Sequence, residues 1–219
     1  MNWLVLFDVD GTLLLTHDKV YVEANRIALT EVFGVTPDGA DVPGDTATAH
    51  TRRALAAAGF RAAEIDAGMP RWCASFSEHY LELLADADTS AWEVGPGAQN
   101  AIAALDRRAL LTGNPPAVAH ARMERLDLAA FFPPGAGAFG CEREQRTELF
   151  TLARERAGDW PPERTVAVGD TPIDVSSAHA AGCRCIAVTT GKYARHQLAS
   201  ADVVIPELTE LETALAALN

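Results

Sequence analysis

Five short, uninterrupted apolar runs, separated by helix-like segments, constrain the fold of this chain more than any other feature. The runs lie at residues 3–7, 109–112, 165–168, 185–188 and 203–205. Runs of this length without polar interruption are typical of strands buried on both faces. The helical patterns between and after them cover residues 98–107, 116–126, 147–157, 175–181 and 208–218. Strands that alternate with helices favour right-handed crossovers and a mainly parallel sheet, so we predict an open doubly wound α/β fold.

Residues 16–92 interrupt this alternation. The stretch contains helical patterns at 20–33, 47–58 and 72–85 and almost no strand-like run. It ends at residues 93–97, where Pro and Gly indicate a turn. We therefore expect an all-helical insert (16–92) in an α/β core formed by residues 1–15 and 93–219.

The charge balance argues against two classes of partner. The chain has 18 Lys and Arg against 30 Asp and Glu, a formal net charge of −12. Nucleic acids and anionic membrane surfaces require a basic face, so we expect neither as a partner. A small phosphorylated metabolite stays compatible, because local positive groups can dominate one pocket of an acidic protein.

The apolar runs and the cysteines predict a cytoplasmic protein. No run approaches the roughly 20 apolar residues of a membrane span, and the apolar N-terminus is too short for a signal peptide. The four cysteines, Cys73, Cys141, Cys183 and Cys185, lack the paired spacing of a zinc site. We expect them to be buried or idle thiols, as in a reducing cytosol.

Two acidic segments follow the first and third apolar runs. Asp8 and Asp10 precede a Gly at the end of the first run, and Asp170 and Asp174 follow the third. Either segment alone could be a turn or a helix cap. Carboxylates crowded at neighbouring strand ends repel one another unless a cation or a proton intervenes, and oxygen ligands of this kind suit Mg²⁺. The two segments together predict a magnesium site formed by these four residues.

Two further segments offer groups for a phosphate. Thr112, Gly113 and Asn114 follow the second apolar run, where a hydroxyl and free backbone N–H groups can bind phosphoryl oxygens. Arg143 and Arg146 lie between a possible strand at 136–140 and the helix predicted at 147–157. Either guanidinium could supply a permanent charge and a fixed fork of donors.

In this order, the segments resemble the motifs of the haloacid-dehalogenase superfamily, in particular its capped, phosphoglycolate-phosphatase-like branch. The first motif of that family, DxDGT, is matched by Asp8, Asp10, Gly11 and Thr12; the second by Thr112; and the fourth, GDxxxD, by Gly169, Asp170 and Asp174. The third motif differs, because relatives usually carry a Lys there and this chain has no Lys between Lys19 and Lys192. The run around Arg146 resembles a subset with Arg in that place, so we favour Arg146; the usual spacing points nearer Arg143, which stays an alternative.

The resemblance implies a Rossmann-like core in which the helical insert is a cap. It implies that Asp8 is the nucleophile, which forms an aspartyl-phosphate, and that Asp10 is the general acid and base. Mg²⁺ would bind the Asp8 carboxylate, the Asp10 backbone carbonyl and Asp170, with Asp174 close by. Thr112 and one of the arginines would bind phosphoryl oxygens.

The expected substrate is a small phosphomonoester, and the protein is expected to be a monomer or a homodimer. The acid at Asp10 favours phosphate chemistry over dehalogenation, since a dehalogenase has no leaving alkoxide to protonate. Two alternatives remain: a phosphomutase of the same superfamily, and a non-catalytic protein that binds a phosphorylated ligand.

Overall fold

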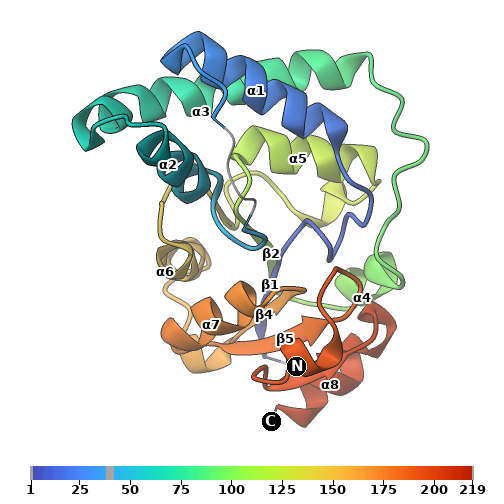
Figure 1. The fold of residues 1–219 in the computed structure, drawn as a ribbon. Coiled ribbons are helices and arrows are strands. Elements are labelled where there is room, and N and C mark those ends of the chain that lie inside the picture. The colour runs from blue at the N-terminus through green and yellow to red at the C-terminus, as the bar shows by residue number, and fades with distance from the viewer. Residues whose placement is uncertain (1, 38–41, 219) are drawn as a thin grey trace.

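The computed structural model describes residues 2–37 and 42–218 and confirms the doubly wound fold (Figure 1). Its six strands are β1 (Leu4–Phe7), β2 (Arg108–Thr112), β3 (Ala138–Phe139), β4 (Thr165–Gly169), β5 (Arg184–Val188) and β6 (Val203–Ile205). They form one sheet in the order β3-β2-β1-β4-β5-β6, and every pairing is parallel. The chain builds one half of the sheet outward from β1 and the other half outward from β4. The crevice where ligands bind in such sheets therefore lies at the carboxyl ends of β1 and β4.

Helices cover both faces of this sheet. Those on one face are α4 (Ala98–Ala103), α5 (Pro116–Arg125) and α8 (Leu211–Ala217), and those on the other are α6 (Arg146–Arg156) and α7 (Pro172–Ala180). In β1, Val5 and Phe7 pack into the first of these layers and Leu4 and Leu6 into the second. Successive side chains of a strand point to opposite faces, so a strand covered on both sides is apolar throughout.

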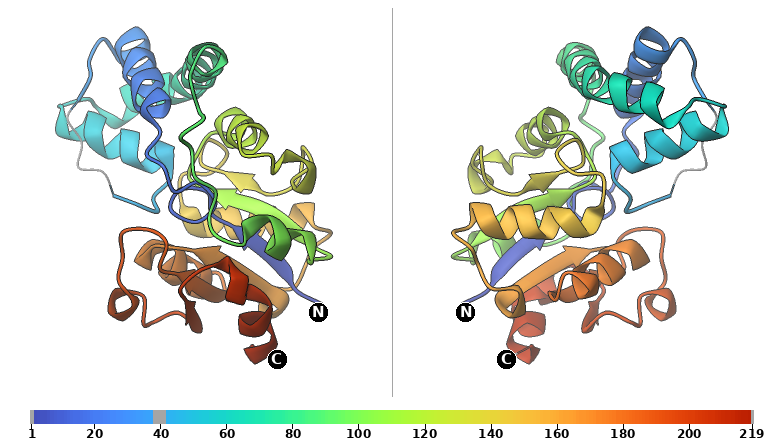
Figure 2. Two further views of the ribbon diagram at one scale, coloured as in Figure 1. Left: turned by 90° about the vertical axis from the view of Figure 1, so that its right-hand side faces the viewer. Right: turned by 90° about the vertical axis from the view of Figure 1, so that its left-hand side faces the viewer.

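Three helices form a separate layer at one end of the molecule (Figure 2). They are α1 (Lys19–Phe33), α2 (Ala47–Ala57) and α3 (Ala62–Ala85). Their apolar cluster centres on the buried side chains of Trp72, Phe76 and Tyr80 and includes Val118 and Ala121 of α5. In the described residues of the predicted insert all regular structure is helical; residues 38–41 lie outside the described part of the chain. The division into core and cap at residues 15 and 93 stays a prediction.

Helix α3 begins ten residues before the predicted start at residue 72, so that Pro70 lies inside it. A proline in a helix interior removes a hydrogen bond and costs about 3 kcal/mol. Here the apolar positions continue across the proline, with Ile65 and Met69 buried before it and Trp72 after it. Packing of this apolar stripe in the cluster of the helical layer explains why the helix continues through Pro70.

The cysteines differ in part from the prediction. Cys73 of α3 and Cys141, which follows β3, form a disulfide across 68 residues of sequence, so the expectation of thiols is wrong for this pair. Cys183 and Cys185 are buried and free, as expected. In the part of the chain that the structure describes, no helix is long and apolar enough to cross a membrane. The disulfide removes one of the arguments for a reducing compartment, and the cytoplasmic location stays a prediction.

Candidate active site

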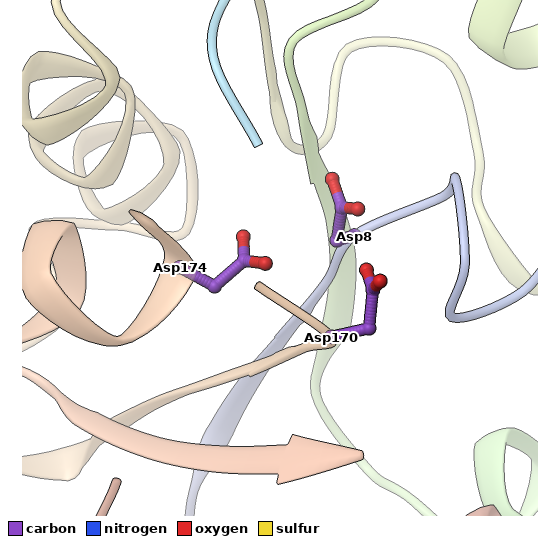
Figure 3. A group of neighbouring side chains, drawn as sticks. All are labelled: Asp8, Asp170 and Asp174. Carbon is purple, nitrogen blue, oxygen red and sulfur yellow. The ribbon is translucent and has the colours of Figure 1, made fainter. Parts of the chain in front are cut away.

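The carboxylates of Asp8, Asp170 and Asp174 converge at the switch point of the sheet (Figure 3). Asp8 follows β1, and its backbone N–H donates to the carbonyl of Val168 in β4 at 2.9 Å. Asp170 follows β4 directly. One oxygen from each of the three carboxylates lies within 4.8 Å of the others, and all three residues are buried. Parallel pairing of β1 with β4 therefore brings the two predicted acidic segments together.

Two glycines make room for the carboxylate of Asp170. A Cβ atom at either Gly11 or Gly191 would collide with that carboxylate. Gly11 also has a φ of 78°, which a residue with a side chain adopts only with strain. In this confined space the Oδ1 atom of Asp170 is buried and has no hydrogen-bond partner among the described residues. A buried carboxylate oxygen without a donor is an oxygen ligand available to a cation.

Asp174 is fixed by the first turn of α7. Thr171 caps this helix: its hydroxyl accepts the backbone N–H of Asp174 at 3.1 Å. In return, Oδ2 of Asp174 accepts the backbone N–H of Thr171 at 2.9 Å and its hydroxyl at 2.7 Å. Asp174 is thus part of a capping box and of the acidic cluster at once. The capping leaves its Oδ1 atom to face the site.

Arg146, rather than Arg143, lies at the acidic cluster. Arg146 is the first residue of α6 and is buried. Its Nη2 atom donates to Oδ1 of Asp8 at 2.8 Å and to Oδ1 of Asp174 at 2.5 Å. Arg143 is exposed, and its guanidinium donates to the carbonyl of its neighbour Glu142 at 2.7 Å. The structure thus separates the two candidates that the sequence left open.

The site contains more negative charge than its own arginine can balance. Burial raises the pKa of Asp8 well above its usual range, an effect that Arg146 opposes and that Asp174 and Asp170 reinforce. Burial also raises the pKa of Asp170 to about 7, with Asp174 adding to the effect. Fully ionised, three carboxylates and one guanidinium carry a net charge of −2 (−3 + 1). A divalent cation would complete this balance.

Asp10 lies outside the three-carboxylate cluster, and its side chain has different partners. The Nδ2 atom of Asn114 donates to Oδ2 of Asp10 at 2.7 Å and to the hydroxyl of Thr112 at 2.9 Å. The Nη1 atom of Arg122 lies 3.0 Å from both carboxylate oxygens of Asp10. Gly113 accepts the backbone N–H of Ala47, the first residue of α2, at 2.8 Å. The predicted phosphate-binding segment thus lies beside Asp10 and beneath the helical layer.

Arg122 is a site residue that the sequence analysis missed. It lies in α5 between Ala121 and Met123, and a charged side chain in a helix is usually directed to solvent. Here it is 1% exposed and bound to Asp10, from which 112 residues of sequence separate it. Only its position on the apolar side of the helix could have marked it, and that position depends on which neighbours cover the helix.

Comparisons with known proteins agree with this geometry. A sequence profile described as haloacid dehalogenase-like hydrolase matches residues 4–182. The phosphoglycolate phosphatase of Chromobacterium violaceum is 30% identical over 216 residues, covering 94% of this chain and 93% of that protein. Protein CbbY of Cereibacter sphaeroides is 29% identical over 228 residues, with the same two coverages. A crystal structure of a CbbY variant from Rhodobacter sphaeroides with xylulose-(1,5)bisphosphate has a TM-score of 0.71 at 25% identity over 100% of both chains.

The matched region includes the strand ends that carry the acidic cluster and the predicted phosphate-binding segment. Relatives of similar length match over nearly the whole chain, so the likeness is not confined to the sheet. The chain therefore belongs to the haloacid dehalogenase-like hydrolases, and its relatives among the phosphoglycolate phosphatases indicate that it is a phosphatase.

Proposed function

We propose that this protein is a Mg²⁺-dependent phosphatase that hydrolyses a small phosphomonoester through an aspartyl-phosphate on Asp8. The observation that carries the proposal is the group of three buried carboxylates and one buried guanidinium at the switch point of the sheet. Phosphoryl transfer depends mainly on positioning and on charge neutralisation. This arrangement provides both at the place where a doubly wound sheet binds its ligand.

The residues present fit a magnesium ion. Asp8 and Asp170 would hold it together with the backbone carbonyl of Asp10, and the unpartnered Oδ1 atom of Asp170 supports this assignment. Asp174 would lie close by, since its oxygens already accept hydrogen bonds from Thr171 and Arg146. When bound, Mg²⁺ supplies the positive charge that lets an anionic phosphate approach a carboxylate.

The side chains of this protein would divide the reaction between them. A carboxylate oxygen of Asp8 attacks phosphorus, and Asp10 protonates the leaving alkoxide. Asp10 then takes a proton from the water that hydrolyses the aspartyl-phosphate. Arg146 and Thr112, with the backbone N–H groups of residues 113 and 114, would bind the phosphoryl oxygens. Arg146 is already bonded to the nucleophile, which places its charge beside the reacting phosphate.

We also propose that residues 16–92 are the cap of this site. The start of α2 lies on the core loops, because the hydroxyl of Thr46 donates to the carbonyl of Glu144 at 2.6 Å and that of Thr48 to Gly140 at 2.6 Å. A covered site favours a small substrate and excludes water during transfer. The names of the relatives support a short phosphorylated acid or a sugar bisphosphate as the substrate class.

Steady-state assays with Mg²⁺ test the proposal, using 2-phosphoglycolate, xylulose 1,5-bisphosphate and 4-nitrophenyl phosphate. We expect the Asp8→Asn variant to lose turnover. The matched Asp10→Asn variant should keep most Mg²⁺ binding and lose about 10²- to 10⁴-fold in rate with the two substrates that release an alkoxide, the usual contribution of a general acid. Substantial turnover by purified Asp8→Asn protein would contradict the mechanism. A phosphomutase would isomerise the substrate without releasing phosphate, and a binding protein would bind it without turnover.

A further inference from the structure

A buried arginine connects the proposed general acid to the helical layer. Arg122 lies on α5, whose Val118 and Ala121 pack into the apolar cluster of that layer. Ala119 and Met123 of the same helix pack against the sheet. Helix α5 is thus shared by both parts of the molecule, and Arg122 is buried at their boundary.

On the side of the active site, Arg122 holds the carboxylate of Asp10. Its Nη1 atom lies 3.0 Å from each of the two oxygens. The side chain of Asp10 is 56% exposed, so packing alone does not fix its orientation. Among the described residues, its side-chain hydrogen bonds come from Arg122 and Asn114. These two donors therefore determine where the carboxylate points.

On the opposite side, the same guanidinium binds the helical layer. Its Nε and Nη2 atoms lie 3.0 and 2.9 Å from Oδ2 of Asp18, the residue that caps α1. The hydroxyl of Tyr80 in α3 donates to that same oxygen at 2.8 Å. The ring of Tyr21 in α1 lies 4.8 Å from the guanidinium carbon, within the range of a cation–π contact. Arg122 is therefore anchored to both α1 and α3.

A purely structural role does not account for this arrangement. A guanidinium is always charged, and the buried carboxylate of Asp18 already pairs with it. The additional contact with a half-exposed carboxylate directs a donor toward the active site, and a planar fork of donors can fix two carboxylates at once. The orientation of Asp10 thus depends on where the first turn of α1 and helix α3 lie.

We propose that Arg122 is a positioning residue that orients Asp10 for proton transfer and makes this orientation depend on Asp18 and Tyr80 of the helical layer. The inference rests on the proposed function, in which Asp10 protonates the leaving group. The proposal predicts what happens when Arg122 is removed. The carboxylate of Asp10 turns away from the leaving oxygen, while the nucleophile and the phosphate-binding groups stay in place.

A comparison of substrates with different leaving groups makes the misorientation of Asp10 measurable. An alkoxide needs a proton as it leaves, whereas 4-nitrophenolate is stable enough to leave with little help. The kcat/KM value reports the steps up to formation of the aspartyl-phosphate. For Arg122→Gln we expect kcat/KM to fall by about 100-fold with an alkyl phosphate and by less than about tenfold with 4-nitrophenyl phosphate, the same pattern as for Asp10→Asn. Arg122→Lys, which keeps the charge, should restore part of the loss.

Arg125 offers a matched control on the same helix. Its guanidinium also joins α5 to α3, through a hydrogen bond to the carbonyl of Leu84 at 2.6 Å, but within the described residues it forms no hydrogen bond or ion pair with Asp10. Arg125→Gln should leave the ratio of the two kcat/KM values unchanged. The Tyr80→Phe variant, which keeps the ring and loses only the hydroxyl, should change that ratio in the same direction as Arg122→Gln and by less.

An unchanged ratio of the two kcat/KM values in Arg122→Gln would overturn the proposal, whether both values fall equally or neither falls. If Arg122→Gln does not fold, the ratio measured for Tyr80→Phe decides, and an unchanged ratio there overturns the link to the helical layer. The wild-type protein is assayed first. If the wild type hydrolyses neither substrate, the proposed function itself is contradicted. If the wild type is active and Arg122→Gln loses equally with both substrates, only the role of Arg122 is contradicted.

Discussion

Replacing Arg146 by Met tests the charge balance of the site. The substitution keeps an unbranched stem and removes the guanidinium that binds Asp8 and Asp174 at 2.8 and 2.5 Å. Loss of one partner from a buried ion pair costs about 3–5 kcal/mol, because the remaining charge is left without compensation. For a chain of this size, 1 kcal/mol corresponds to about 2–4 °C in Tm, so we expect Tm to fall by about 10 °C. The measurement belongs at pH 8, above the pKa of about 7 of Asp170.

Arg143→Met is the matched control for this experiment. Arg143 is exposed, so its replacement should change the free energy of unfolding by less than about 0.5 kcal/mol. Thermal unfolding is followed by circular dichroism in EDTA and again with Mg²⁺. We expect Mg²⁺ to recover part of the stability lost in Arg146→Met, because a cation replaces the missing positive charge.

Activity provides the second measurement. Removing a donor to the transferring phosphate costs about 10²- to 10³-fold in kcat, so Arg146→Met should lose that much and Arg143→Met should stay near the wild type. If the two variants were equally stable in EDTA, our account of the buried charges would be refuted. A loss of activity confined to Arg143→Met would give the cationic role to that residue instead.

Three further predictions concern metal, disulfide and pH. Mg²⁺ at one hundred times its Kd should stabilise the wild type by about 2.7 kcal/mol, and a thermal scan of Asp170→Asn should show no such shift; an equal shift in the variant would exclude Asp170 as a ligand. Cys73→Ser removes the disulfide with Cys141, which spans 68 residues, and should lower the free energy of unfolding by about 4 kcal/mol in denaturant titrations. A reductant should destabilise the wild type similarly and leave the variant unchanged. The hydrogen bond that the His79 ring donates to the carboxylate of Glu31 raises the pKa of His79 above its ordinary value of 6.5. The stabilisation that protonated His79 gives the folded state is therefore complete below about pH 6 and is lost as pH rises through the higher pKa of the folded state. His79→Gln should flatten the dependence of Tm on pH between about 6 and 8, and a curve parallel to the wild type would contradict this.

Much of the fold follows from local pattern. The apolar run at residues 3–7 becomes β1, and the run at 165–168 becomes β4, because a strand covered on both faces needs apolar side chains at every position. Parallel strands place their carboxyl ends at one edge, so the sequence alone puts Asp8 and Asp170 at the same edge of the sheet, and the pairing of β1 with β4 makes them neighbours. The prediction of an acidic site needed only the order of the strands and the residues that follow them.

The partners of these carboxylates were decided by the tertiary structure. Arg143 and Arg146 are three residues apart, and only the start of α6 turns the second one inward to Asp8, across 138 residues of sequence. From the sequence, Arg122 looks like an ordinary exposed helix residue, because its burial depends on contacts with α1 and α3. Likewise, nothing in the sequence pairs Cys73 with Cys141. Hydrophobic periodicity indicates whether a position is buried. The side chain that it contacts depends on which distant segments pack together, and only the tertiary structure determines that.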